Sequence, residues 1–291
     1  MSLFTYLFRK NCTKSDAQRD AGLTTPPQVE RYDGLVYGSD PVWQSLDLYC
    51  PKGQTGSLPV IVSFHGGGWV YGTKETYQFY CMDLARRGFA VINYNYRLAP
   101  EHRYPAAMED TNLVFRWLAE HAGEYALDLS RLFAVGDSAG AMGIALYACI
   151  LTNPAYAAKY SFHAPEGICI RGLGLNCGMY TAKDKERVLR DMLPKRRAAE
   201  TLPLLNALDH ITADFPPCYI MTANQDFLRH EPQALTDLLD RLHIPYHFRM
   251  YGSEENPLGH VFHCNIRSAD ARAVNDAECD FFRSLTEKLT D

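Results

Sequence analysis

The sequence predicts an α/β protein with a mainly parallel central sheet and helices on both faces. Nearly continuous apolar runs, typical of strands covered on both sides, recur at 58–64, 89–94 and 132–135. Segments with helical spacing separate these runs, so strand and helix alternate along the chain. The chain has 291 residues, of which 47% are hydrophobic and 22% charged, which is ordinary for a soluble globular protein with a substantial core.

Charge and cysteine content narrow the classes of function. The net charge of −5 gives no reason to expect nucleic acid or an anionic membrane as a partner. The nine cysteines are scattered singly, without a Cys-x-x-Cys pair, which is typical of free thiols in a reducing compartment. Residues 1–10 have the wrong order and length for a signal peptide, and no stretch approaches a membrane span. We therefore expect a soluble, cytoplasmic protein.

The first part of the chain starts with residues 1 to about 30, which are polar and are expected to be irregular. Two alternating stretches follow at 30–37 and 43–49, and the turn residues between them predict an antiparallel pair. From residue 58 to residue 175 we expect, in order, strand 58–64, helix 77–87, strand 89–94, helix 106–120, strand 132–135, helix 141–148 and strand 168–175.

The alternation breaks at 179–211, a charged, helix-forming segment that is longer than a normal crossover. We interpret it as a small helical cap over the strand ends. The alternation then resumes, with strand 217–222, helix 232–242, strand 245–251 and helix 269–289. Because there is no internal repeat and no linker, we predict a single domain over 1–291, with cap elements at about 1–40 and 179–211.

The segment Gly136-Asp137-Ser138-Ala139-Gly140 is a candidate catalytic motif between a predicted strand and a predicted helix. A serine on such a tight turn adopts a strained backbone geometry, so glycine is needed two residues to either side. The turn lifts the hydroxyl to a helix N-terminus, whose N–H groups face developing negative charge. The G-x-S-x-G pattern alone also fits an ordinary turn that opens a helix, so the assignment depends on other parts of the chain.

A second candidate, His65-Gly66-Gly67-Gly68-Trp69, ends the apolar run 58–64. Three consecutive glycines lose much backbone entropy on folding, so a structural reason for them is expected. One reason is a loop whose N–H groups approach a ligand oxygen closely; the alternative is a flexible turn. The flanking His65 and Trp69 favour the first interpretation.

Ser138 needs a base, and the base needs a third group that orients it. In a parallel sheet ligands bind at the carboxyl ends of the strands, so the partners should follow strands. Asp226 comes directly after strand 217–222, and His260 lies in the loop after the last strand. The order Ser, Asp, His is the one expected of an α/β-hydrolase.

Each partner has competitors in the sequence. Asp209 in the cap and Asp214 on the approach to a strand are less well placed than Asp226, and Asp240 lies in a helix. Asp226 could instead be a simple loop or capping residue. His263 could serve as the base in place of His260. His260, His263 and Cys264 could also be metal ligands, but a zinc site needs more converging ligands than this local group offers. We therefore expect no metal.

The chain resembles the hormone-sensitive-lipase-like family of α/β-hydrolase carboxylesterases over roughly residues 58–265. The resemblance rests on motifs in the family's order, followed by the later Asp and His: His65-Gly66-Gly67-Gly68-Trp69, Tyr96-Arg97-Leu98-Ala99-Pro100-Glu101-His102 and Gly136-Asp137-Ser138-Ala139-Gly140. It implies the α/β-hydrolase fold, with Ser138 as nucleophile, Asp226 as orienting acid and His260 as general base.

The same resemblance implies an oxyanion hole made by the backbone N–H groups of Gly66, Gly67 and Ala139. We also expect a substrate pocket that includes Trp69, Asp137, Phe227 and Val261.

The expected function is that of a serine carboxylesterase, which hydrolyses small to medium carboxylic esters through an acyl-enzyme. Two alternatives are kept: a non-catalytic ligand-binding member of the same fold, and a small serine peptidase. The expected partner is a small-molecule ester, with no cofactor, no nucleic acid and no membrane. A homodimer is kept open as the form of assembly.

Overall fold

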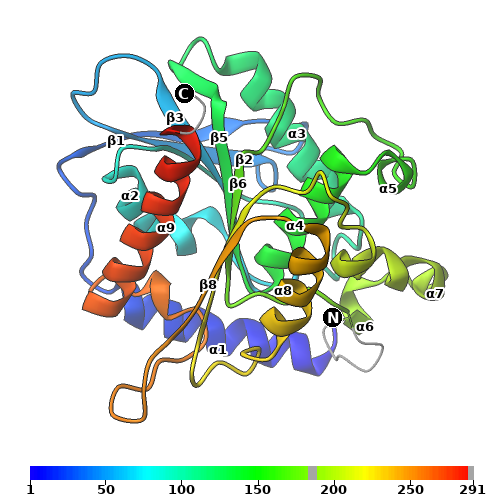
Figure 1. Ribbon diagram of the computed structural model, residues 1–291. Helices are drawn as coiled ribbons and strands as arrows, with labels where there is room; N and C mark the ends of the chain where they lie inside the picture. Colours follow the sequence, from blue (N-terminus) through cyan, green and yellow to red (C-terminus); the bar gives the residue numbers. More distant parts are fainter. Residues whose placement is uncertain (183–188, 288–291) are drawn as a thin grey trace.

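The computed structural model describes residues 1–182 and 189–287 and contains an eight-stranded sheet with the order β1-β2-β4-β3-β5-β6-β7-β8 (Figure 1). The antiparallel pairings join β1 (Val29–Val36) to β2 (Ser45–Pro51) and β2 to β4 (Ala90–Tyr94). The parallel part of the sheet adds β3 (Leu58–Phe64), β5 (Leu127–Asp137), β6 (Gly172–Asn176), β7 (Cys218–Ala223) and β8 (Tyr246–Tyr251). The predicted mainly parallel α/β fold is confirmed.

Helices cover both faces of this sheet, and the side chains of the central strands alternate between two cores. Val60 and Val62 of β3 point into one core, and Ile61 points into the other. The first core is covered by α3 (Ala106–His121), α4 (Ala139–Thr152) and α8 (Glu231–Leu242). The second is covered by α2 (Lys74–Ala85) and α9 (Ala269–Glu287).

The expectation of irregular structure before residue 30 is wrong, because Leu3–Asp20 forms α1. Ser2 caps this helix, with its Oγ accepting the N–H of Thr5 at 3.2 Å. Two arginines attach α1 to the body of the protein: Arg9 Nε donates to the Val70 carbonyl at 2.6 Å, and Arg19 Nη2 donates to the Thr76 carbonyl at 2.5 Å. Figure 1 shows α1 lying across one end of the sheet.

The predicted insertion lies between β6 and β7. Its described elements are the short helices α6 (Leu189–Met192) and α7 (Ala198–Thr201) and the 3₁₀ turns η1 (Leu202–Leu205) and η2 (Ala207–Asp209). Residues 183–188 of the expected cap lie outside the described part of the chain. The Ser2 N–H donates to Asp191 Oδ2 at 2.8 Å, which joins the start of α1 to α6.

Two short elements complete the described chain: α5 (Pro154–Ala157) after α4, and the 3₁₀ turn η3 (Phe262–Cys264) after β8. Among the helices of the described ranges, none is both long and apolar enough to cross a membrane.

Candidate active site

The turn between β5 and α4 holds Ser138 in a left-handed backbone conformation, with φ 53° and ψ −119°. A Cβ on Gly136 would lie 2.4 Å from the Gly140 carbonyl oxygen, and one on Gly140 would lie 2.2 Å from the Phe64 carbonyl oxygen. Both distances are too short for any side chain. The predicted requirement for glycine on either side of the serine is therefore confirmed.

Ser138 lines a cavity of about 210 Å³ that His260 and Gly67 also line. One wall of the cavity comes from α1, through Phe8, Cys12, Ser15, Asp16 and Arg19. The sequence interpretation missed these residues, because a mainly polar helix gives only a weak amphipathic signal. Ser2 as an N-cap and the spacing of Phe8, Cys12 and Ser15 on one helical face were the available signals.

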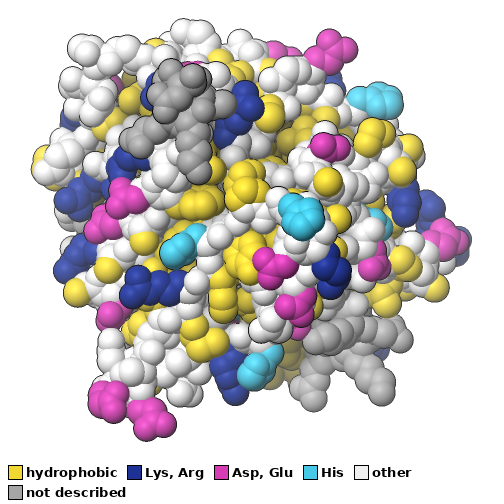
Figure 2. Space-filling model, in the orientation of Figure 1, with side chains coloured by type: hydrophobic (Ala, Val, Ile, Leu, Met, Phe, Trp, Pro, Cys, Tyr) yellow, Lys and Arg dark blue, Asp and Glu magenta, His cyan; other side chains and the backbone are white. Residues whose placement is uncertain are grey.

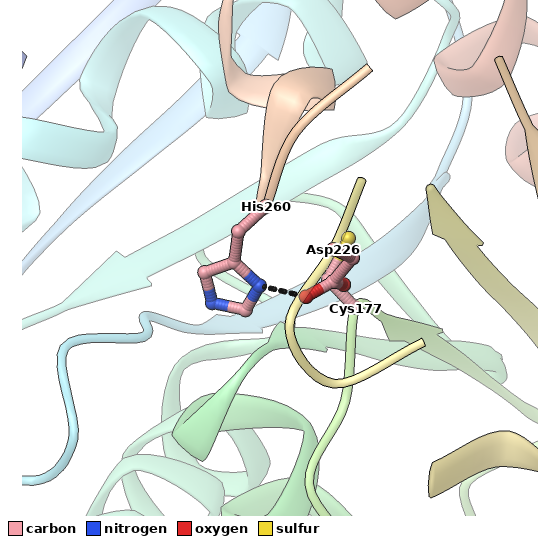
Figure 3. A group of neighbouring side chains, drawn as sticks. All are labelled: Cys177, Asp226 and His260. Carbon is pink, nitrogen blue, oxygen red and sulfur yellow. Dashed lines mark hydrogen bonds and ion pairs between the residues drawn. The ribbon is translucent and has the colours of Figure 1, made fainter. Parts of the chain in front are cut away.

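The loops after β7 and β8 bring Asp226 and His260 together. His260 Nδ1 lies 2.8 Å from Asp226 Oδ1 (Figure 3). The carboxylate is fully buried and accepts two further hydrogen bonds, from the Leu228 N–H at 2.8 Å and from Thr222 Oγ1 at 3.0 Å. Burial alone would raise the pKa of Asp226, but the hydrogen bond and charge of His260, aided by the Leu228 N–H, hold this pKa below its ordinary value.

The competing residues lie elsewhere. His263 is fully buried on η3, and burial lowers its pKa to about 3. Asp209 accepts a hydrogen bond from Asn206 in the insertion, and Asp240 accepts one from the Tyr246 hydroxyl. None of these three residues lines the cavity of Ser138.

The group of three ligand-type side chains that the described ranges bring together is Cys177, Asp226 and His260, whose ligand atoms lie within 4.8 Å of one another. It shares His260 with the group considered as metal ligands from the sequence, but not His263 or Cys264. Figure 3 shows Cys177 beside the carboxylate of Asp226. Burial raises the pKa of the Cys177 thiol well above its ordinary value, so sulfur stays protonated beside the His–Asp hydrogen bond.

The glycine loop after β3 approaches Ser138 through Gly67, whose φ is +110°. A Cβ there would lie 2.1 Å from the Tyr71 carbonyl oxygen, so only glycine fits. The N–H of Ala139 opens α4, where first-turn N–H groups have no partner within the helix. Gly67 thus lines the same cavity as Ser138, and Ala139 follows Ser138 directly in the sequence.

The N–H of Gly66, in contrast, is already bonded inside the protein. It donates to Asp137 Oδ1 and to the Tyr77 hydroxyl, both at 3.1 Å. The expectation that Gly66 supplies an oxyanion-hole donor is therefore wrong, because its one hydrogen is already shared between two acceptors of the protein. Tyr77 is a site residue that the sequence interpretation did not single out.

The four expected pocket residues divide into two groups. Asp137, Phe227 and Val261 line the cavity. Trp69 does not: its side chain is 2% exposed and its ring packs in the core, 5.4 Å from the ring of Phe64. The expectation for Trp69 is wrong because the indole also packs against the buried rings of Tyr96 and Tyr104 in the core.

Comparison with known proteins gives consistent results. A family model described as alpha/beta hydrolase fold matches residues 61–263. Esterase LipI of Mycobacterium tuberculosis is 30% identical over 241 residues, which cover 78% of this chain and 72% of LipI. Acetyl esterase of Salmonella schwarzengrund is 29% identical over 70% of this chain and 66% of that protein.

Among solved structures, esterase B from Lactobacillus rhamnosis inhibited by a tributyrin phosphonate has a TM-score of 0.89 and 24% sequence identity. The superposition covers 98% of this chain and 95% of that esterase, which shows the shared fold. The family match and the curated relatives identify the protein: the chain belongs to the hormone-sensitive-lipase-like family of α/β-hydrolase carboxylesterases.

Proposed function

We propose that the protein is a serine carboxylesterase that hydrolyses small to medium carboxylic esters. Ser138 Oγ attacks the ester carbonyl carbon while His260 Nε2 accepts its proton, and Asp226 stabilises the imidazolium. The observation that carries this proposal is the 2.8 Å bond from His260 Nδ1 to the buried Asp226, at the wall of the cavity that Ser138 lines. Because Nδ1 is engaged by the carboxylate, Nε2 is the nitrogen left to serve Ser138.

The N–H groups of Gly67 and Ala139 stabilise the oxyanion of the tetrahedral intermediate. As that intermediate collapses, the alcohol leaves with the proton from His260, and the acyl group remains on Ser138. His260 then takes a proton from water, whose oxygen attacks the acyl carbon. The second collapse returns the proton to Ser138 Oγ and releases the carboxylic acid.

The two alternatives, a non-catalytic binder and a serine peptidase, would require different side chains at the site. A non-catalytic binder of this fold would not need a base with an orienting acid, whereas His260 and Asp226 form that pair. A peptidase would be expected to carry acidic groups that bind a substrate amine. Asp16 is an acidic side chain of α1 at the cavity, and it accepts hydrogen bonds from Arg19 and Tyr71.

Replacing the nucleophile gives the first test. Ser138→Ala should lower the turnover of p-nitrophenyl acetate by about four to six orders of magnitude, because the acyl-enzyme cannot form. A fluorophosphonate probe should label the wild type and a Ser130→Ala control, but not Ser138→Ala. Labelling of Ser138→Ala, or a rate near that of the wild type, would contradict the assignment.

The two neighbouring histidines give the second test. His260→Ala should lower kcat by about three orders of magnitude or more, since serine then has no base. His263→Ala should keep kcat within about tenfold when rates are expressed per folded molecule, because His263 does not line the cavity. Steady-state kinetics and circular dichroism measure both effects. A loss confined to His263→Ala would mean that His263 is the base.

The cavity under α1 limits substrate size and gives the third test. Its volume of about 210 Å³ is below the range of about 300–1,000 Å³ that is usual for pockets of drug-sized ligands. Ser2 before Phe8 and Arg9 after it attach this part of the chain to the body of the protein, so the wall should not move away from a longer acyl chain.

We therefore expect kcat/KM for p-nitrophenyl esters to be highest from acetate to butyrate and to fall by about tenfold or more at octanoate, since overpacking opposes longer chains. Phe8→Ala should shift the preference to longer acyl groups. Phe4→Ala, one turn away on α1 and outside the cavity lining, is the matched control. An octanoate preference in the wild type would refute the size limit while leaving the esterase assignment intact.

We propose that the homodimer kept open above forms at β8, the outermost strand of the sheet. Phe248 and Met250 are 40% and 47% exposed on one side of this strand, and Figure 2 shows hydrophobic side chains along the middle of this face. An edge strand can pair antiparallel with its own copy across a two-fold axis, which satisfies its outer N–H and C=O groups.

Phe248→Lys should convert a dimer to a monomer in size-exclusion chromatography with light scattering. Val42→Lys, at a 73% exposed apolar residue near the opposite edge of the sheet, should leave the mass unchanged. A monomeric wild type would refute the proposed dimer.

We also propose a cytoplasmic location. All nine cysteines are free in the structure, and seven of them are buried. Free buried thiols are typical of proteins from reducing compartments, which supports the cytoplasm.

A further inference from the structure

Asp137 precedes the nucleophile and carries a carboxylate that the ester hydrolysis proposed above does not use directly. This side chain lies at the end of β5 and the residue is 2% exposed. Asp137 Oδ2 accepts the hydroxyl of Tyr77 from α2 at 2.7 Å, and Oδ1 accepts the N–H of Gly66 at 3.1 Å. One carboxylate thus joins the serine turn, the glycine loop and a helix on the second face of the sheet.

The glycine loop lies close against this carboxylate. A Cβ on Gly66 would lie 2.5 Å from Asp137 Oδ2 and 2.9 Å from the Tyr77 hydroxyl. The Gly66 N–H also donates to that hydroxyl at 3.1 Å, so Gly66, Tyr77 and Asp137 form a closed triangle of hydrogen bonds. The loop can approach this closely because Gly66 has no side chain.

The other side of Gly66 is held as well. The ring of His65 is buried, and its Nδ1 lies 2.8 Å from the Gly66 carbonyl oxygen. Burial lowers the pKa of His65 to about 4, so the ring is neutral near pH 7 and donates from Nδ1. Because a trans peptide places C=O and N–H on opposite sides, holding the Gly66 carbonyl also orients the N–H of Gly67.

We propose that Asp137, together with Tyr77, is a positioning residue that holds the glycine loop so that the Gly67 N–H meets the oxyanion. This inference rests on the proposed esterase function. Three consecutive glycines would otherwise sample many conformations, and oxyanion stabilisation depends on donors that are already aligned. The bond from Gly66 to Asp137 removes that freedom one residue before the donor.

The burial of Asp137 supports a functional reason for the carboxylate. Burial raises its pKa to about 6, although the hydrogen bond from Tyr77 acts in the opposite direction. Burying a charged carboxylate costs free energy of folding, and the raised pKa reflects this cost. Such groups cluster at functional sites, where they hold other groups in place.

The test compares Asp137→Asn and Tyr77→Phe with the control Glu278→Gln. Glu278 is also buried and also accepts a tyrosine hydroxyl and an amide N–H, from Tyr80 and Asn176, but it lies on α9. The substrate is p-nitrophenyl acetate. The inhibitor is a short trifluoromethyl ketone, whose adduct with serine carries an oxyanion.

Asp137→Asn should lower kcat by about 10- to 100-fold, less than or equal to the loss of one oxyanion donor, while KM changes by less than about threefold. The Ki of the ketone should rise by a similar factor. Tyr77→Phe should act in the same direction, and the double variant should lose less than the product of the single losses, because both act through one contact. Glu278→Gln should keep kcat and Ki within about threefold.

Three outcomes would overturn the inference: unchanged kcat and Ki in Asp137→Asn, a change confined to KM, or a lower kcat with an unchanged Ki. If circular dichroism shows that Asp137→Asn does not fold, the kcat and Ki of Tyr77→Phe, which keeps the carboxylate, test the inference instead. If the wild type hydrolyses no ester, the esterase proposal itself is refuted. If the wild type is active but one of the three outcomes above is found, only the positioning role of Asp137 is refuted.

Discussion

The arrangement of the site depends on one close approach between the serine turn and β3. Ser138 has a left-handed backbone at the point where α4 starts against the end of β3. At Gly140 the two elements are so close that a Cβ would collide with the Phe64 carbonyl oxygen. β3 and β5 are parallel neighbours, with Phe64 paired to Gly136. The glycine loop and Ser138 therefore leave the sheet side by side, as the proposed oxyanion donor requires.

The second feature of the site is that it is closed by the first helix of the chain. Arg9 and Arg19 join α1 to backbone carbonyls of the body, and Ser2 joins it to α6 in the insertion. Arg9 binds the Val70 carbonyl in the loop after β3, and Arg19 binds the Thr76 carbonyl in the first turn of α2. A mainly polar helix can thus be held firmly without a large apolar face, and it determines the size of the cavity over Ser138.

Most of the fold and part of the site were predictable from the sequence. The parallel strands β3, β4 and β7 carry mostly apolar runs, and Ser138, Asp226 and His260 follow β5, β7 and β8 in the expected order. Residues 3–20 were predicted wrongly, because helix α1 is stabilised by contacts to distant carbonyls rather than by an apolar stripe. Local propensity does not record such contacts.

The sequence by itself determined most of the strands and helices, the glycines required around Ser138, and the side chains that are proposed to react. Those features depend on local backbone geometry and on periodicity, which are written along the chain. Only the tertiary structure decided that Gly66 bonds Asp137 and Tyr77, that Trp69 belongs to the core, and that α1 covers the cavity. Each of these features depends on which distant segments of the chain come into contact in the folded protein. The contacts decide which acceptor a backbone N–H finds and which space a side chain fills.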